Sequence, residues 1–146
     1  KTTKPLYEDL KHKLSTNLKS YVKWLQELPY YVEEDDFILV HAGLTPGKSV
    51  QESRKEDLIR IRTWDGKGEN TNSRHNPAWY EFYQGQKLVI YGHYAIEGLK
   101  IREKTIGLDS GCVWGKELTA LIMSHDNKKE FVQVKAKKAY VVASSE

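Results

Sequence analysis

The sequence predicts an α/β fold, in which short buried strands are combined with helices. Two apolar runs, Phe37–Val40 and Leu88–Tyr91, consist of β-branched, aliphatic and aromatic residues bounded by turn residues, which is typical of buried strands. A third observation is that leucines between residues 6 and 25 recur at helical spacing. Together these patterns favour one domain in which helices accompany a sheet.

Length and composition limit the class of protein. The 146 residues are enough for one domain with one core, and a hydrophobic content of 39% with 29% charged residues is ordinary for a globular protein. A net charge of +3 is too weak to favour nucleic acid as a partner. Cys112 is the single cysteine, so an internal disulfide framework is excluded, and no apolar run approaches the length of a membrane span. The first residues show neither Met nor a signal pattern, which suggests a fragment.

The first predicted element is an amphipathic helix of about twenty residues from Leu6 to Leu25, which ends before Pro29 and is expected to pack on the sheet. An acidic turn over residues 33–36 leads into the first strand. After that strand, Ser49 and Ser53 are each followed by Glu three residues on, so they are capping-box candidates for a helix through about Arg60. A polar surface loop then runs to Pro77.

An aromatic cluster over residues 79–83 precedes the second strand and is expected in the core, although one ring, Trp79, is a weak candidate for stacking on an adenine. Three further strands are predicted over residues 101–108, 118–124 and 130–136, and the last two should form an antiparallel hairpin. The tail, about residues 141–146, is expected to be disordered.

Two histidines lie where the first two predicted strands end. Small residues accompany both, Gly43 near His41 and Gly92 beside His93, and these let backbone or substrate come close. Functional side chains of α/β proteins lie just past the carboxyl ends of strands. Because neutral imidazole is the commonest protein ligand for zinc, iron or manganese, His41 and His93 are predicted to share a metal ion. Structural histidines with satisfied hydrogen bonds are the competing interpretation.

Four segments occur in an informative order: Phe37–Pro46, Trp79–Tyr83, Val89–His93 and Thr105–Leu121. Over about residues 21–136 they closely resemble the second half of the calcineurin-like metallophosphoesterases. The most similar branch is that of symmetrical diadenosine tetraphosphatase and the fungal endopolyphosphatases. The resemblance implies that residues 1–146 are the C-terminal half of a four-layer α/β/β/α sandwich, with a mixed sheet and antiparallel hairpins.

The resemblance also implies a site with two divalent metal ions (manganese, zinc, iron or cobalt) that activate water for attack on phosphorus. Histidines that match His41 and His93 bind one of these metals. An arginine of the region after the first histidine holds the phosphoryl group, and Arg62, with Arg60 as the alternative, is predicted to take this role; a surface ion pair is the competing interpretation. Asp109 is predicted either to accept a hydrogen bond from a ligand histidine or to cap its own turn.

The remaining metal ligands of the family come from Asp-x-His, Gly-Asp-x-x-x-x-x-Gly and Gly-Asn-His motifs, and this sequence contains none of them. Two histidines alone are too few to hold a metal. A missing N-terminal half of the same protein is the partner expected to supply the rest. The alternative is a non-catalytic relic of the family.

Three functions stay open. The first is hydrolysis of phosphoanhydride bonds in polyphosphate or a dinucleoside polyphosphate, the second is a serine/threonine protein phosphatase, and the third is a non-catalytic binding module on half a phosphatase fold. The first is favoured because protein phosphatases usually read His-Gly-Gly and Ala-Pro-Asn-Tyr-Cys where this chain has His41-Ala-Gly and Leu108-Asp-Ser-Gly-Cys. The expected ligand is a phosphate-containing small molecule or polyphosphate. The compartment is cytoplasmic by default, or vacuolar if the endopolyphosphatase resemblance holds.

Overall fold

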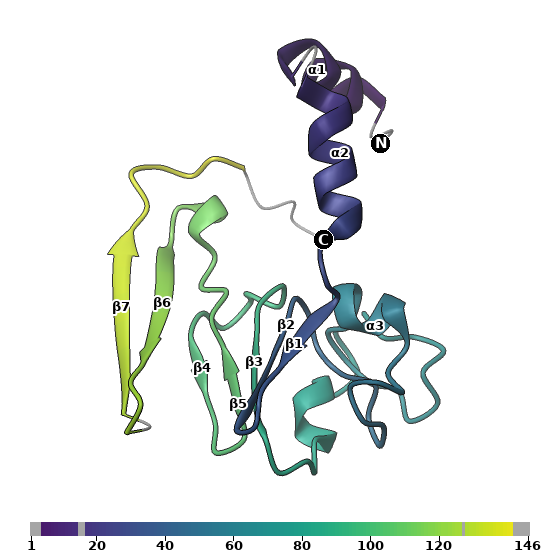
Figure 1. Ribbon diagram of the computed structural model, residues 1–146, viewed down its shortest axis with the longest axis vertical. Helices are drawn as coiled ribbons and strands as arrows, with labels where there is room; N and C mark the ends of the chain where they lie inside the picture. Colours follow the sequence, from purple (N-terminus) through teal and green to yellow (C-terminus); the bar gives the residue numbers. More distant parts are fainter. Residues whose placement is uncertain (1–3, 15–16, 127, 142–146) are drawn as a thin grey trace.

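The centre of the molecule is a five-stranded mixed sheet, shown by a computed structural model that describes residues 4–14, 17–126 and 128–141 (Figure 1). The strands lie in the spatial order β1-β2-β3-β5-β4. Strands β2, β3 and β5 are parallel, and β1 and β4 pair antiparallel at the two edges. The predicted mixed α/β fold is therefore confirmed. The strands are β1 (Tyr31–Glu33), β2 (Phe37–Val40), β3 (Leu88–Tyr91), β4 (Lys100–Ile101) and β5 (Thr105–Gly107).

The two apolar runs of the sequence are the neighbouring parallel strands β2 and β3. Their register is fixed by burial, because a slip of one residue would turn every inward side chain to the other face. Leu39 lies opposite Ile90, and Ile90 lies opposite Ile106 on the next strand. The carboxyl ends of three parallel strands therefore lie side by side at one edge of the sheet.

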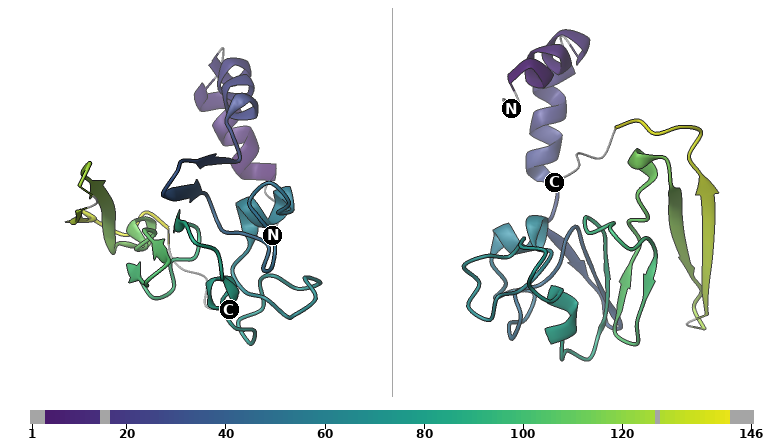
Figure 2. Two further views of the ribbon diagram at one scale, coloured as in Figure 1. Left: turned by 60° about the horizontal axis from the view of Figure 1, so that its bottom comes forward. Right: turned by 180° about the vertical axis from the view of Figure 1, so that it is seen from behind.

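A separate antiparallel hairpin follows the sheet, as predicted, and consists of β6 (Glu117–Met123) and β7 (Lys129–Lys135) (Figures 1 and 2). The single strand predicted over residues 101–108 is wrong. The segment is instead two short antiparallel strands, β4 and β5. The Arg102 N–H donates to the Thr105 carbonyl (2.9 Å), and this closes a tight turn within the segment.

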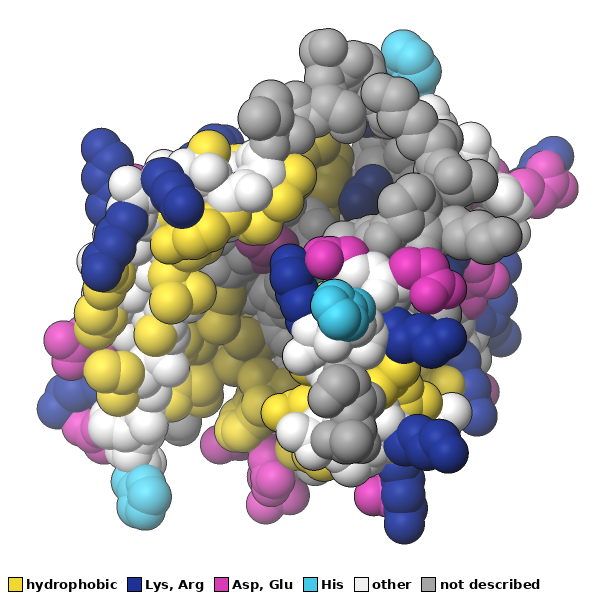
Figure 3. All heavy atoms as spheres, turned by 90° about the horizontal axis from the view of Figure 1, so that it is seen from above, with side chains coloured by type: hydrophobic (Ala, Val, Ile, Leu, Met, Phe, Trp, Pro, Cys, Tyr) yellow, Lys and Arg dark blue, Asp and Glu magenta, His cyan; other side chains and the backbone are white. Residues whose placement is uncertain are grey.

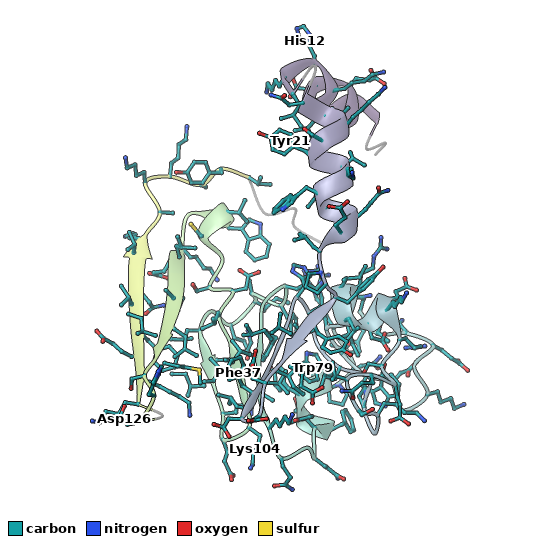
Figure 4. All side chains as sticks on the ribbon, viewed as in Figure 1. His12, Tyr21, Phe37, Trp79, Lys104 and Asp126 are labelled. Atoms are coloured by element: carbon teal, nitrogen blue, oxygen red, sulfur yellow. The ribbon has the colours of Figure 1, made fainter. Side chains whose placement is uncertain are left out.

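The N-terminal helical region differs from the prediction in two ways. It comprises two helices, α1 (Lys4–Leu14) and α2 (Leu18–Glu27), with Asn17 at the N-cap of α2. The side chain of Asn17 makes no capping hydrogen bond, but its carbonyl accepts one from Ser20 Oγ (2.8 Å). The helices do not pack on the sheet: they stand away from it, with His12 at the far tip (Figures 1 and 4), and α2 has no buried residue. None of the described helices is long and apolar enough to cross a membrane.

Helix α3 (Lys55–Arg60) begins later than the Ser49 and Ser53 patterns predict. Ser49 caps the preceding turn instead, because its Oγ donates to the Glu52 carboxylate (2.8 Å). Ser53 Oγ accepts a hydrogen bond from the Thr45 N–H (3.1 Å) and thereby supports the segment after β2. Two short 3-10 helices lie between strands: η2 (Trp79–Phe82) comes before β3, and η3 (Cys112–Trp114) comes before β6. The tail prediction falls on residues 142–146, which lie outside the described residues, and on Val141, which is exposed.

The core lies between one face of the sheet, α3 and η2, and Trp79 is at its centre with 1% of its surface exposed. The indole meets Tyr80, Tyr83 and Tyr91 edge to face or nearly so. It also packs directly on Gly43, where a Cβ atom would lie 2.3 Å from Trp79 Cε2. The glycine after His41 is therefore required by packing, since no side chain fits beside the indole.

We expect Gly43→Ala to lower the free energy of unfolding by about 1–3 kcal/mol, the usual cost of overpacking a filled core. Equilibrium unfolding in urea measures the change. Gln84→Ala, at an exposed loop position, is the control and should leave the midpoint almost unchanged. Equal stability of the Gly43 variant and the parent would contradict the packing described for Trp79.

Candidate active site

Three segments meet where the parallel strands end. His41 follows β2, His93 follows β3 after one glycine, and Asp109 follows β5 after one leucine. Open α/β sheets bind ligands in the crevice outside the carboxyl ends of their strands. The sheet topology alone therefore brings together three of the residues predicted for the site.

The two histidine rings are neighbours: their centroids are 5.2 Å apart, with 48° between the ring planes. The Gly92 N–H donates to the His41 carbonyl (2.9 Å), so the backbones are joined just before the second ring. A Cβ at Gly92 would lie 3.4 Å from that carbonyl oxygen and 3.8 Å from Asp109 Cβ. His93 has a φ of 62°, a left-handed backbone conformation that costs energy in a residue other than glycine. Strain of this kind is concentrated at functional sites.

His93 is held in its neutral form. Partial burial lowers the pKa of His93 below its ordinary value, and the charge of Arg62 and the neighbouring His41 lower it further. A hydrogen bond to the backbone of Arg60 and the charge of Asp109 act in the opposite direction. The neutral imidazole is the form that binds a metal ion.

Arg60 and Arg62 make different contributions to this neighbourhood. Arg60 ends α3, and its backbone interacts with His93, whereas its side chain is exposed. Arg62 is fixed through its main chain: its N–H donates to the Thr71 carbonyl (2.9 Å), and its carbonyl accepts from the Trp79 N–H (3.2 Å). The positive charge of Arg62 adds to the lowering of the His93 pKa that burial causes, and it opposes the rise that burial causes in the pKa of Tyr94, so this guanidinium lies on the histidine side of the molecule.

Asp109 caps its own turn, because its Oδ1 accepts a hydrogen bond from the Gly111 N–H (3.1 Å). Its charge also favours the protonated form of His93. Of the two roles expected from the sequence, turn capping is present in the structure, and the role beside a ligand histidine stays a prediction. Trp79 is buried in the core, which favours its packing role over stacking on a base, because a ring 1% exposed offers no open face.

The sequence reasoning missed Lys100. This lysine is only 6% exposed, and its Nζ donates to the carbonyls of Tyr94 (2.6 Å) and Gly98 (3.3 Å). Burial lowers the pKa of Lys100. The ammonium group thereby ties down the loop that follows His93. A lone lysine at the start of a short strand gives no sequence signal of burial, since lysine is exposed in most proteins.

The described residues do not by themselves form a complete metal site. Among them, no group of three or more His, Cys, Asp or Glu side chains could hold a metal ion. His41 and His93 suit zinc, iron or manganese in kind, since both are imidazoles and lie within reach of a shared ion, but not in number. A metal ion bound by these two histidines would need further ligands from outside this set.

Relatives with assigned functions match most of the chain. A bis(5'-nucleosyl)-tetraphosphatase PrpE (asymmetrical) of Anoxybacillus flavithermus is 30% identical over 126 residues, which cover 82% of this chain and 51% of the relative. A second PrpE enzyme, from Oceanobacillus iheyensis, is 26% identical and covers 96% of this chain and 56% of the relative. A symmetrical bis(5'-nucleosyl)-tetraphosphatase of Vibrio campbellii is 25% identical, with 79% and 63% covered. No family model matches the sequence.

The fold has a counterpart among solved structures. A crystal structure assigned as a diadenosine tetraphosphatase superposes with a TM-score of 0.67 at 26% identity, covering 88% of this chain and 63% of that one. The chain is thus a homologue of the bis(5'-nucleosyl)-tetraphosphatases, within the calcineurin-like metallophosphoesterases, as the sequence motifs predicted. It spans about half the length of the PrpE relatives that it matches.

We expect the His93 imidazole of the metal-free protein to titrate below about 6.5, the ordinary value for histidine. Arg62→Gln should raise this pKa, because it removes a positive charge that opposes protonation. The unfolded chain binds the proton more readily than the folded chain, so stability should fall as the pH drops through the ordinary pKa of histidine. Titration by NMR of the imidazole carbon-bound protons measures the shift. A His93 pKa that is unmoved by Arg62→Gln would contradict the proximity of the two side chains.

Proposed function

We propose that the chain is the C-terminal half of the catalytic domain of a calcineurin-like metallophosphoesterase that hydrolyses phosphoanhydride bonds. Its favoured substrate class is the dinucleoside polyphosphates. The observation that carries the proposal is the convergence of His41 and His93 at the ends of adjacent parallel strands, in a homologue of dinucleoside tetraphosphatases. The relatives' names support the substrate class, and the geometry supports a metal-dependent site.

In this proposal, histidines of the chain bind the metal and an arginine binds the phosphoryl group. His41 and His93 hold a divalent metal, and the neutral state of His93 leaves a lone pair available for it. Divalent metals at such sites lower the pKa of water and withdraw charge from the phosphoryl group, and two ions are the arrangement expected here. Arg62 binds the phosphoryl oxygens through its planar guanidinium, with Arg60 as the second candidate.

Exposed apolar surfaces support the incompleteness of the domain. Trp24 and Leu25 of α2 are 57% and 58% exposed, and Leu118 and Val134, which pair on one face of the β6–β7 hairpin, are each 62% exposed. Seen from above, hydrophobic side chains line the hairpin and the hollow beside it (Figure 3). Contiguous apolar surface of this kind marks an interaction site. We assign it to the remaining half of the domain, the partner that also supplies the missing metal ligands.

Inorganic polyphosphate contains the same phosphoanhydride bond and is the second candidate substrate. A protein phosphatase is less favoured, because Ala42 stands where protein phosphatases usually have Gly, and Asp109-Ser-Gly stands where they usually have Pro-Asn-Tyr. A non-catalytic binding module is the remaining alternative, and it requires the absence of bound metal.

In a full-length protein that carries this chain, we expect His41→Ala or His93→Ala to lower hydrolysis of diadenosine tetraphosphate more than about 100-fold. Loss of groups that merely support metal ligands already costs about 10- to 100-fold. The fold should persist, because His41 is exposed and His93 only half-buried. Steady-state kinetics with saturating manganese, together with circular dichroism, measures both effects. His125→Ala, in the exposed hairpin turn, is the matched control. Undiminished turnover in either site variant would refute the site.

The substrate class is tested by assays of the full-length protein with three substrates in parallel: diadenosine tetraphosphate, polyphosphate and a phosphopeptide. We expect the highest kcat/KM with diadenosine tetraphosphate, because the relatives with assigned function carry that specificity in their names. A preference for the phosphopeptide would contradict the phosphoanhydride proposal. No hydrolysis of any of the three and no bound metal would establish the binding-module alternative.

A further inference from the structure

One carboxylate in the core carries a charge that neither the metal chemistry nor the packing requires. Asp57, in α3, is 2% exposed and lies beside Leu58 and Ile61 of the apolar core. Burial of a charge is costly unless it is paired and hydrogen-bonded. Apolar residues of similar volume often stabilise a core as well as a buried ion pair does. The position of this carboxylate therefore calls for an explanation other than stability.

The Asp57 carboxylate is fully engaged by two neighbours. Its Oδ2 accepts hydrogen bonds from Thr45 Oγ1 (2.6 Å) and from Arg54 Nε (2.7 Å). Its Oδ1 accepts from Arg54 Nη2 (3.0 Å). Thr45 Oγ1 in turn accepts a hydrogen bond from the main-chain N–H of Arg54 (3.0 Å), so Asp57, Arg54 and Thr45 form a closed triangle of contacts. A two-pronged contact between arginine and carboxylate fixes geometry as well as energy.

The first arm of this triangle, the contact between Asp57 and Thr45, connects α3 to the segment that follows His41. Thr45 is four residues after His41, and the residues between them are buried. The Ala42 N–H donates to the carbonyl of Leu58, the residue next to Asp57 (2.9 Å). The segment that carries His41 is therefore attached to α3 at both its ends.

The second arm, the contact between Asp57 and Arg54, connects α3 to the loop that holds Arg62. Arg54 Nη1 donates to the Gly68 carbonyl (2.9 Å), and its guanidinium lies over the Trp64 ring, 5.9 Å from the centroid. Both contacts are with the loop whose Thr71 carbonyl receives the Arg62 N–H. The main-chain carbonyl of Asp57 also accepts a hydrogen bond from the N–H of Ile61 (3.1 Å), the C-cap of α3, so the helix ends two residues before Arg62.

We propose that Asp57 is a positioning residue that fixes the His41 segment and the Arg62 loop relative to each other, so that the phosphate-binding arginine faces the metal-binding histidines. This inference rests on the function proposed above for His41, His93 and Arg62. Asp57 itself lies in the core and does not touch the substrate. Its buried contacts with Thr45 and Arg54 hold the His41 segment and the Arg62 loop at a fixed distance from each other.

A measurement without catalysis tests the first arm. In the 146-residue chain, the rings of His41 and His93 are close enough to give a nuclear Overhauser effect between their carbon-bound protons. We expect Asp57→Asn and the milder Thr45→Val, which keeps the ion pair with Arg54, to abolish this cross-peak. Lys87→Met is the matched control: it removes a half-buried ion pair with Glu33 (2.9 Å) at the opposite end of β3 and should keep the cross-peak. A cross-peak that persists in folded Asp57→Asn and Thr45→Val would overturn the inference, whether or not the protein is a hydrolase.

A double-mutant cycle in the full-length protein tests the second arm. Asp57→Asn should lower kcat/KM for diadenosine tetraphosphate by about 10- to 100-fold, as is usual for residues that orient site residues. In an Arg62→Gln background the same substitution should have a smaller further effect, because the part that acts through Arg62 is already lost and only the part that acts through His41 is left, whereas a general loss of stability would act independently in both backgrounds. Fully additive effects would overturn the inference. If the parent protein hydrolyses nothing, the proposed function fails, and the cross-peak experiment still decides the role of Asp57.

Discussion

The parallel pairing of β2, β3 and β5 is the constraint on which the rest of the structure depends. Because these three strands run in the same direction and in register, the residues that follow them meet at one edge. His41, His93 and Asp109 are far apart in the sequence, yet strand order brings their backbones to the same edge, and the contacts of Asp57 then fix the segment that follows His41. The additional demands are local: a small residue at position 92, and a positive φ at His93. The site is thus a direct product of strand order, and it would be lost if β3 paired elsewhere.

The two faces of this sheet are covered unequally. One face is covered by α3, η2 and their loops, with Trp79 at the centre. On the other side, a shallow groove runs over Tyr30, Val32 and Leu39, each about two-fifths exposed, and reaches His41. The incomplete ligand set and the uncovered apolar face are therefore adjacent. In the proposed function, the other half of the domain would pack on that face and supply both a cover and ligands; the chain spans 51% of a PrpE relative.

The strands and the positions of His41 and His93 at their ends were predictable from the sequence because the signals are local, whereas metal binding by these histidines stays a prediction. Apolar runs bounded by turns have one plausible structure, and the pattern gave the bounds of β2 and β3 correctly. The packing of α2 was not predictable: amphipathic spacing shows that a helix has an apolar face, but not what covers it. Asp57 and Lys100 were missed for a similar reason, since a charged residue in a polar segment carries no sign of burial. Their roles depend on contacts with Thr45 and Tyr94, which only the folded chain reveals.

Anomalous diffraction from crystals of a full-length protein that carries this chain, grown with manganese and measured above the manganese absorption edge, tests the central claim most directly. The account predicts an anomalous peak within bonding distance of imidazole nitrogens of both His41 and His93, on the side of the sheet edge that Arg62 faces. A well-ordered structure with both histidines in place and no metal between them, or with manganese bound only at a different location, would contradict it.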